Sequence, residues 1–223
     1  MKRLQFLLLP LAVVFFWAPA TWAAGAAADN CIQGNGAMGS EPRILDPFSR
    51  IDADGAFEIR IVCGRDQQLR IEAETNLIPH IRTRVQDRTL FIDTDRSVCA
   101  RKEMRIAIAV PVLDAFFADG AIDASISDIR ADRFDLTLAG SGNATVSGQV
   151  RQFSARLTGA GDLQGTGLMA RSASVILAGA GQAAVYAAQY LEATIEGVGD
   201  ITVHGDPEEI VEHINGVGEV IRQ

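Results

Sequence analysis

The sequence has few aromatic residues and almost no lysine. Aromatic side chains make up 6% of the 223 residues, and both tryptophans, Trp17 and Trp22, lie near the N-terminus. Lys102 is the only lysine after Lys2, and the net charge at pH 7 is −8. An acidic chain of this composition offers no basic surface for a nucleic acid. It also provides little from which to build an aromatic platform for stacking sugars.

Motifs of the common catalytic and metal sites are missing as well. The three histidines, His80, His204 and His213, form no H-E-x-x-H motif and have no cysteine at metal-ligand spacing. There is no G-x-S-x-G motif, so we expect no enzyme activity and no cofactor. The alternative is a polysaccharide-cleaving enzyme, which needs two carboxylates brought together by the fold. The candidates for such a pair are Asp119, Asp123, Asp128, Asp132 and Asp135.

The first 23 residues have the pattern of a secretory signal peptide. Lys2 and Arg3 precede an apolar run over residues 4–17, and the segment closes with the small residues of "APATWAAG". The run contains Pro10 and is short for a membrane span. Cleavage after Ala23 would leave 18 basic and 28 acidic side chains, a net charge of −10. No later apolar run is long enough to span a membrane, so we expect a periplasmic or extracellular protein.

Residues 24–42 are small, polar and rich in turn formers, which predicts a flexible lead. The segment "GNGAMG" within it matches G-x-G-x-x-G, but a dinucleotide site needs a strand before this motif and a helix after it. Here the motif follows the predicted cleavage site and runs into Pro42. We therefore expect one folded domain over residues 43–223, with nonrepeating strands at 43–112 and glycine-cornered repeats at 113–223.

Three cysteines follow the signal peptide, in a compartment that permits disulfides. Cys63 ends the strand-like "FEIRIVC" and Cys99 precedes the strand-like "MRIAIAV", whereas Cys31 lies in the lead. The sequence predicts a disulfide between Cys63 and Cys99 and leaves the role of Cys31 open.

Residues 43–112 alternate between apolar and polar side chains. Phe57, Ile59 and Ile61 share one face of an extended segment, and Glu58 and Arg60 share the other. The same alternation recurs over residues 69–73, 90–92 and 106–110, and no window keeps a helical period. This pattern predicts half-buried β-strands.

A glycine motif recurs after Pro111. The segments "LAGSGN", "LTGAGD", "LAGAGQ", "IEGVGD" and "INGVGE" each carry two glycines around one small residue, and the first glycines are 19, 20, 18 and 19 residues apart. Alternating residues lie between them. A fixed period near 19 with glycine corners predicts an all-β solenoid, a parallel β-helix capped by the strands of residues 43–112. The predicted corners are Gly140, Gly142, Gly159, Gly161, Gly179, Gly181, Gly197, Gly199, Gly216 and Gly218.

Two roles are open for the residue after each second glycine. "GAGD" and "GVGD" are similar to calcium-binding repeats, which need a period of nine and an aspartate at almost every repeat. Here the period is twice as long and the residue varies, which favours a solvated polar ladder. The metal site is the alternative, with Asp162, Asp200 and Glu219 as its weak candidates.

Most of the chain resembles a known family. The segments "FSRIDADGAFEIRIVCG", "LRIEAETNLIPHIRTRV" and "VPVLDAFFADGA", together with the glycine repeats and the closing "GVGDITVHGDPEEIVEHINGVGEV", resemble the putative auto-transporter adhesin head GIN domain. The resemblance runs from about residue 43 to the end of the sequence. It implies a right-handed β-helix in a secreted or envelope-located bacterial protein, and it supplies no catalytic or ligand residues.

The function expected from the sequence is therefore adhesin-like binding or scaffolding, without catalysis, through a face of the fold. The expected partner is a protein or another cell-envelope component. The last repeat, "INGVGEVIRQ", has no capping segment after it, and an uncapped strand edge recruits other strands. We therefore expect the C-terminal rung to serve in self-association or in docking an envelope component.

Overall fold

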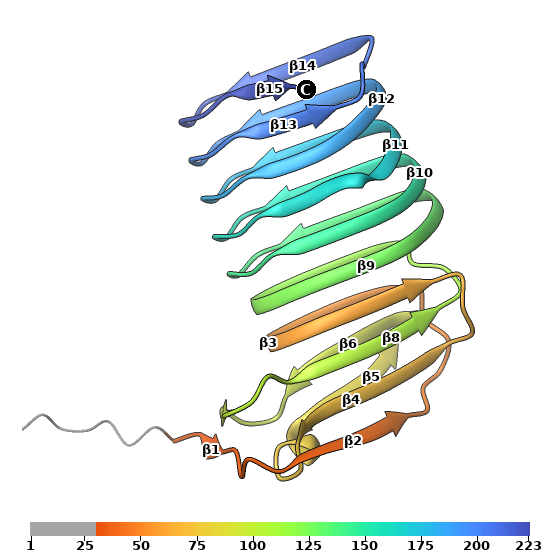
Figure 1. Ribbon diagram of the computed structural model, residues 1–223, viewed down its shortest axis with the longest axis vertical. Helices are drawn as coiled ribbons and strands as arrows, with labels where there is room; N and C mark the ends of the chain where they lie inside the picture. Colours follow the sequence, from red (N-terminus) through yellow and green to blue (C-terminus); the bar gives the residue numbers. More distant parts are fainter. Residues whose placement is uncertain (1–29) are drawn as a thin grey trace, which may run out of the picture. The chain divides into compact units, whose positions relative to one another are not determined.

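The computed structural model describes residues 30–223 and builds them almost entirely from β-strands (Figure 1). The predicted signal peptide lies outside these residues. Among them is one short 3-10 helix, η1 (Ile78–His80). The strands are β1 (Ile32–Gln33), β2 (Met38–Arg43), β3 (Arg50–Cys63), β4 (Gln68–Glu74), β5 (Ile81–Gln86), β6 (Thr89–Thr94), β7 (Val98–Cys99), β8 (Arg105–Val110), β9 (Ala115–Leu138), β10 (Ala144–Leu157), β11 (Leu163–Leu177), β12 (Ala183–Ile195), β13 (Ile201–His204), β14 (Glu209–Ile214) and β15 (Val220–Arg222).

The strands form one large sheet that mixes both directions. Thirteen strands belong to it, in the order β15-β13-β12-β11-β10-β9-β3-β8-β4-β2, with β14 beside β12 and the β5–β6 hairpin beside β3. The pairs that β3 forms with β6, β8 and β9 are parallel, and so are all pairs among β9 to β15. The pairs β2–β4, β4–β8 and β5–β6 are antiparallel. A separate parallel pair joins β1 to β7. The predicted all-β class is confirmed.

The predicted right-handed parallel β-helix is wrong, because the described residues form this 13-stranded mixed sheet. The 19-residue period instead gives the register between neighbouring strands of the parallel part of the sheet. For example, Phe153 pairs with Phe134 on one side and with Ala173 on the other. The antiparallel strands carry no repeat in the sequence, so the period contains no information about them.

The parallel register stacks like residues upon one another. Leu138, Leu157, Leu177 and Ile195 are neighbours on successive strands, and each is at most 7% exposed. The rings of Phe134 and Phe153 stack in the same way, with centroids 6.0 Å apart. Burial of each such side chain stabilises the fold by about 1.5–3 kcal/mol. The outward-facing side chains of the same strands therefore also form continuous rows.

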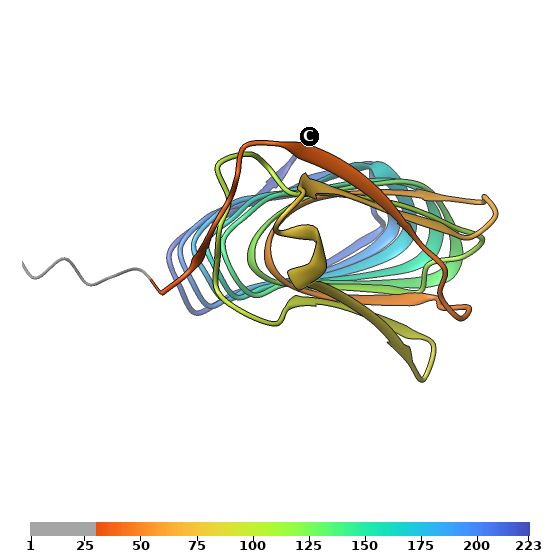
Figure 2. The ribbon, with the colours of Figure 1, turned by 90° about the horizontal axis from the view of Figure 1, so that it is seen from below.

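Nonrepeating segments close the end of the sheet that is built from the N-terminal strands. Figure 2 shows η1 lying across this end. Ile78 of η1 and the preceding Leu77 are buried there. Beside it, the β5–β6 hairpin turns at Asp87 and Arg88, whose φ values of 50° and 61° fit a tight type I′ turn.

The lead over residues 24–42 differs from the expectation in the part that the structure describes. Residues 38–43 form β2, which pairs antiparallel with β4. The loop before β2 is held by the buried carboxylate of Glu74, whose Oε1 accepts a hydrogen bond from the N–H of Gly36. Its Oε2 accepts one from the N–H of Arg101 at 2.8 Å. Turn-forming composition did not reveal this long-range anchor.

The predicted disulfide is wrong in one partner. Cys99 is bonded to Cys31, with a Cα–Cα separation of 5.6 Å, and Cys63 is a buried free cysteine. The pairing follows from β1 and β7, which align Gln33 with Cys99 and bring the lead beside the loop. Cys63 instead ends β3 with its side chain in the core.

Candidate functional site

The glycine motifs lie where the parallel strands turn. The residues between the glycines form a row of parallel bridges, as in Ser141 with Ala160. A Cβ atom on Gly179 would overlap the carbonyl oxygen of Gly159, and the same clash recurs at the other first glycines, Gly140, Gly159, Gly197 and Gly216. Positive φ values, from 143° to 153°, are found at four of the second glycines, Gly142, Gly181, Gly199 and Gly218. The first glycines are thus required by close backbone approach.

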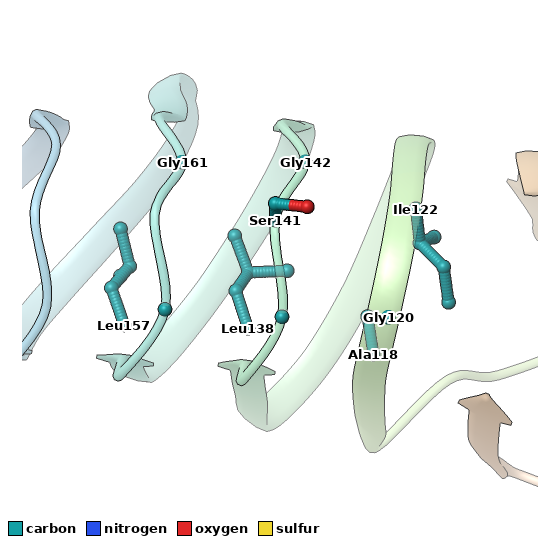
Figure 3. A pocket seen from close by; sticks show the side chains of 10 residues that line it. Ala118, Gly120, Ile122, Leu138, Ser141, Gly142, Leu157 and Gly161 are labelled. Carbon is teal, nitrogen blue, oxygen red and sulfur yellow. The ribbon is translucent and has the colours of Figure 1, made fainter. Parts of the chain in front are cut away.

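A small cavity lies behind two of these corners. Figure 3 shows Leu138 and Leu157 at equivalent positions of neighbouring repeats, with Gly120, Ser141 and Gly142 around them. The cavity volume is about 10 Å³. This is at most the space of one water molecule, so the cavity behind these two glycine motifs is too small for a ligand.

The residues after the second glycines form a ladder of hydrogen bonds between repeats. Asp162 Oδ1 accepts a 2.8 Å bond from the N–H of Gln182, and Asp200 Oδ1 accepts a 3.0 Å bond from the N–H of Glu219. Asn143 Oδ1 does the same for the N–H of Asp162 at 3.2 Å. Among residues 30–223 no group of three potential metal ligands comes together. The side chains of Asp162 and Asp200 thus accept hydrogen bonds from backbone N–H groups of the next repeat.

A large groove lies over β3, β6 and β9, on the outer face of the sheet. Its volume is about 750 Å³, and its lining includes Arg50, Asp52, Phe91, Asp114, Phe117 and Asp135. The strand register explains this lining, because Asp52 pairs with Phe91 on one side and with Phe117 on the other. Two phenyl rings therefore flank one carboxylate on the same face.

A second groove continues the first across β10, β11 and β12. Its volume is about 390 Å³, and its lining includes Gln152, Ser154, Ser172, Ser174 and Tyr190. Arg133 lines both grooves. We call the two together the trough. Between Phe91 and Tyr190 it crosses β6, β3, two neighbouring segments of β9, β10, β11 and β12. These seven segments are about 4.8 Å apart, so the trough extends for roughly 30 Å.

The electrostatics of the trough centre on Asp52. Burial raises the pKa of Asp52, and the Asp54 carboxylate raises it further, while the Arg84 guanidinium lowers it and Asp119 raises it. The guanidinium of Arg84 lies over the Phe91 ring, 4.7 Å from its centroid. No hydrogen bond contributes to the pKa of Asp52 within the described residues. The negative charge of the Asp52 carboxylate is therefore only partly balanced by the Arg84 guanidinium.

The five aspartates considered for a catalytic pair lie in different surroundings. Asp132 and Asp135 line the trough, but each forms an ion pair with an arginine, at 2.8 Å and 2.9 Å. The other three do not line it: Asp119, Asp123 and Asp128. The histidines are also dispersed, since His204 is aligned with Tyr186 and His213 with Thr194.

Sequence reasoning missed Asp52, Phe91 and Phe117 as site residues. A signal was present, because Phe91 lies between the inward-facing Leu90 and Ile92 and must therefore point outward. One outward aromatic side chain is common on protein surfaces, so it points to a binding site only when it belongs to a larger apolar patch. That the three residues meet could not be read from the sequence, since their register depends on long-range parallel pairing.

The comparisons with known proteins agree with the sequence resemblance. A sequence model of the family "Putative auto-transporter adhesin, head GIN domain" matches residues 47–207. The chain belongs to this family. No match is found among curated proteins.

Solved structures share the fold of this GIN-domain protein. A putative adhesin from Bacteroides fragilis is 23% identical, with a TM-score of 0.70 over 86% of this chain and 100% of that one. A putative lipid binding protein from Parabacteroides distasonis is 22% identical, with a TM-score of 0.53 over 86% and 99%. A putative adhesin from the same species is 20% identical, with a TM-score of 0.52 over 87% and 100%. At these identities the likeness establishes the fold alone.

Proposed function

We propose that this GIN-domain protein is a non-catalytic, adhesin-like protein of the bacterial envelope that binds an extended polysaccharide along the trough. The observation that carries the proposal is the continuity of the trough across the parallel strands from β6 to β12, with Arg133 lining both of its halves. A site of this length and openness suits a polymer better than a small molecule, which is normally held in an enclosed pocket.

The chemistry of the lining supports a sugar polymer. Ser154, Ser172, Ser174 and Gln152 supply hydroxyl and amide groups that can both donate and accept hydrogen bonds, as sugar hydroxyls do. Tyr190 at one end of the trough and Phe117 in its other half offer ring surface. The aromatic platform that the composition made us doubt is thus built partly from phenylalanine.

The test is a binding screen of the purified protein against neutral, anionic and cationic polysaccharides, followed by two matched variants. Gln152 lines the trough, whereas Gln149 is exposed elsewhere on the same strand. Gln152→Ala should weaken binding of the polysaccharide that the screen identifies, and Gln149→Ala should leave it unchanged. If no polysaccharide binds, or if both variants bind as the wild type does, the proposed function is wrong.

Polysaccharide cleavage on the same fold is the alternative function. It is favoured by Asp52, a carboxyl group of raised pKa in an open groove, because perturbed pKa values gather at catalytic sites. Cleavage would release new reducing ends or unsaturated products during incubation with the polysaccharides. Product that is lost in Asp52→Asn would replace the binding proposal by the enzymatic one.

Self-association through the last repeat is a further part of the proposal. Within the described residues, β14 and β15 have no strand on their outer side, which leaves an open edge. The inward-facing positions there hold Glu212, which is aligned with Ala193, and Arg222, which is aligned with Val203. Such charges weaken pairing, so we expect weak association. Light scattering at tens of micromolar should detect it in the wild type but not in Val220→Lys.

Export completes the proposal. A signal peptide over residues 1–23, a lead from residue 24 and a domain over residues 43–223 would place the trough outside the cytoplasm. Among residues 30–223, no helix is long and apolar enough to cross a membrane. N-terminal sequencing of the secreted protein should begin at Ala24.

A further inference from the structure

We propose that the trough binds a polysaccharide that carries free amino groups, and that one protonated amine lies between the Phe117 ring and the Asp52 carboxylate. This inference rests on the proposed function and names the chemical class of its ligand. It follows from an asymmetry on the two sides of Asp52.

The two neighbours of Asp52 are equivalent in the register of the sheet. Asp52 is aligned with Phe91 of β6 and with Phe117 of β9, both on the outer face. On the Phe91 side, the guanidinium of Arg84 lies 4.7 Å from the ring centroid. The protein thus already places one cation against a phenyl ring beside Asp52.

The Phe117 side has the same two groups without the cation. In the part of the chain that the structure describes, the only cation over an aromatic ring is that of Arg84. The Phe117 side chain is 39% exposed to solvent in the groove. An ammonium group at such a place is attracted by the quadrupole of the ring. It is attracted as well by the negative charge of the carboxylate beside the ring. A ligand amine would therefore take the position that corresponds to Arg84.

The charges around this position favour a cation. Asp132 and Asp135 are neutralised by Arg151 and Arg133, at 2.8 Å and 2.9 Å. Asp52 is opposed mainly by Arg84, and the negative charges of Asp54 and Asp119 act on it as well. Arg50 and Asp114 also line the groove, and their charges cancel in this balance. The described residues thus retain an excess of negative charge beside Phe117, and this excess complements a protonated amine.

The ligand is a sugar polymer because of where the trough lies. The backbone N–H and C=O groups below it are already bonded within the parallel sheet. A peptide that binds by adding a strand needs a free sheet edge, which this face does not offer. The hydroxyl and amide side chains further along the trough, such as Ser154 and Gln152, suit sugar hydroxyls instead.

The experiment compares two hexasaccharides that differ only at nitrogen: the β-1,4-linked hexamers of glucosamine and of N-acetylglucosamine. Isothermal titration of the purified protein at pH 6 should show binding of the glucosamine hexamer about tenfold tighter, since the acetylated nitrogen carries no charge. Asp52→Asn and Phe117→Leu should each reduce this preference to about twofold or less. Asp206→Asn, the same charge change at an exposed residue outside the trough, should retain it.

Each other result overturns the inference. Equal affinity for the two hexamers, or tighter binding of the acetylated one, would show that the trough does not recognise a protonated amine. The trough would then remain a polysaccharide site. Failure of both hexamers, with another polysaccharide bound in the screen above, does the same. Binding of a lysine hexapeptide without binding of the glucosamine hexamer would assign the cation site to basic proteins. Circular dichroism of each variant shows that it is folded.

Discussion

The carboxylate of Asp162 accepts a 2.8 Å hydrogen bond from the backbone N–H of Gln182, the residue at the same position one repeat later. This contact explains why the repeats prefer Asp or Asn after the second glycine, since a short side-chain oxygen reaches the next strand from there. The polar ladder is thus part of the fold.

We predict that Asp162→Ala lowers the free energy of unfolding by about 1 kcal/mol, because the bond between repeats is lost. For a chain of this length that corresponds to a fall in melting temperature of about 2–4 °C. Glu219→Ala is the control, because its exposed side chain makes no such bond among the described residues. Equal melting temperatures for the two variants would show that the hydrogen-bond ladder does not stabilise the fold.

Gln182 interrupts the ladder, and restoring it should stabilise the protein. Its side chain is one methylene longer than that of Asn143, whose Oδ1 bonds the N–H of Asp162 at 3.2 Å. Gln182→Asn is therefore expected to raise the free energy of unfolding by about 0.5–1 kcal/mol. Chemical denaturation measures the change. An unchanged or lower value would show that the N–H of Asp200 gains nothing from this acceptor.

The corner glycines should differ from glycines that are needed only for their dihedral angles. A Cβ atom at Gly179 would overlap the carbonyl oxygen of Gly159, whereas Gly64 has a φ of 73° and nothing near its Cβ position. Gly64→Ala should cost about 1 kcal/mol through backbone strain, and Gly179→Ala clearly more, about 2–4 kcal/mol, because strands must separate. Similar denaturation midpoints for the two variants would contradict the close-approach account.

The arrangement of the three cysteines predicts how many thiols react with Ellman's reagent. Burial and, to a smaller extent, the Asp128 carboxylate raise the pKa of the Cys63 thiol to about 11, so little reactive thiolate is present at neutral pH. The folded protein should therefore show no thiol toward Ellman's reagent, and the unfolded, non-reduced protein one. Cys31→Ser should add the thiol of Cys99. Three reactive thiols in the unfolded wild type would argue against the Cys31–Cys99 bond.

Glu74 should make stability depend on acid pH. Burial alone would raise the pKa of this carboxyl, but the N–H groups of Arg101, Gly36 and Lys102 more than offset it and hold the pKa below its ordinary value of 4.5. The stabilisation is therefore complete above pH 4.5 and is lost as the pH falls through the lower folded value. Melting temperatures of the wild type and Glu74→Gln should converge in acid. A constant difference at all pH values would contradict this assignment.

The sequence predicted the elements better than their arrangement. Alternation at Phe57, Ile59 and Ile61 defined the inward face of β3, because strand side chains have a period of two. The 19-residue period defined the parallel register of β9 to β12. The reversal of β2 and β4 depends on pairings between residues such as Met38 and Glu74, which leave no periodic trace.

The site was harder to predict than the fold for the same reason. Asp52, Phe91 and Phe117 come from three strands and meet only through register. The disulfide prediction failed for a similar reason. Cys31 reaches Cys99 through the pairing of β1 with β7, and these short strands have no hydrophobic pattern. Motifs within one segment are visible in a single sequence, whereas surfaces built across strands are not.

The trough as binding surface is the central claim, and amide chemical-shift mapping tests it most directly. Labelled protein is titrated with fragments of the polysaccharide that binds best in the screen. The account predicts that the largest shifts fall on residues of the trough, among them Asp52, Phe117, Ser154 and Ser174. Shifts confined to the exposed corner residues Val198 and Val217, or to β14 and β15, would contradict it.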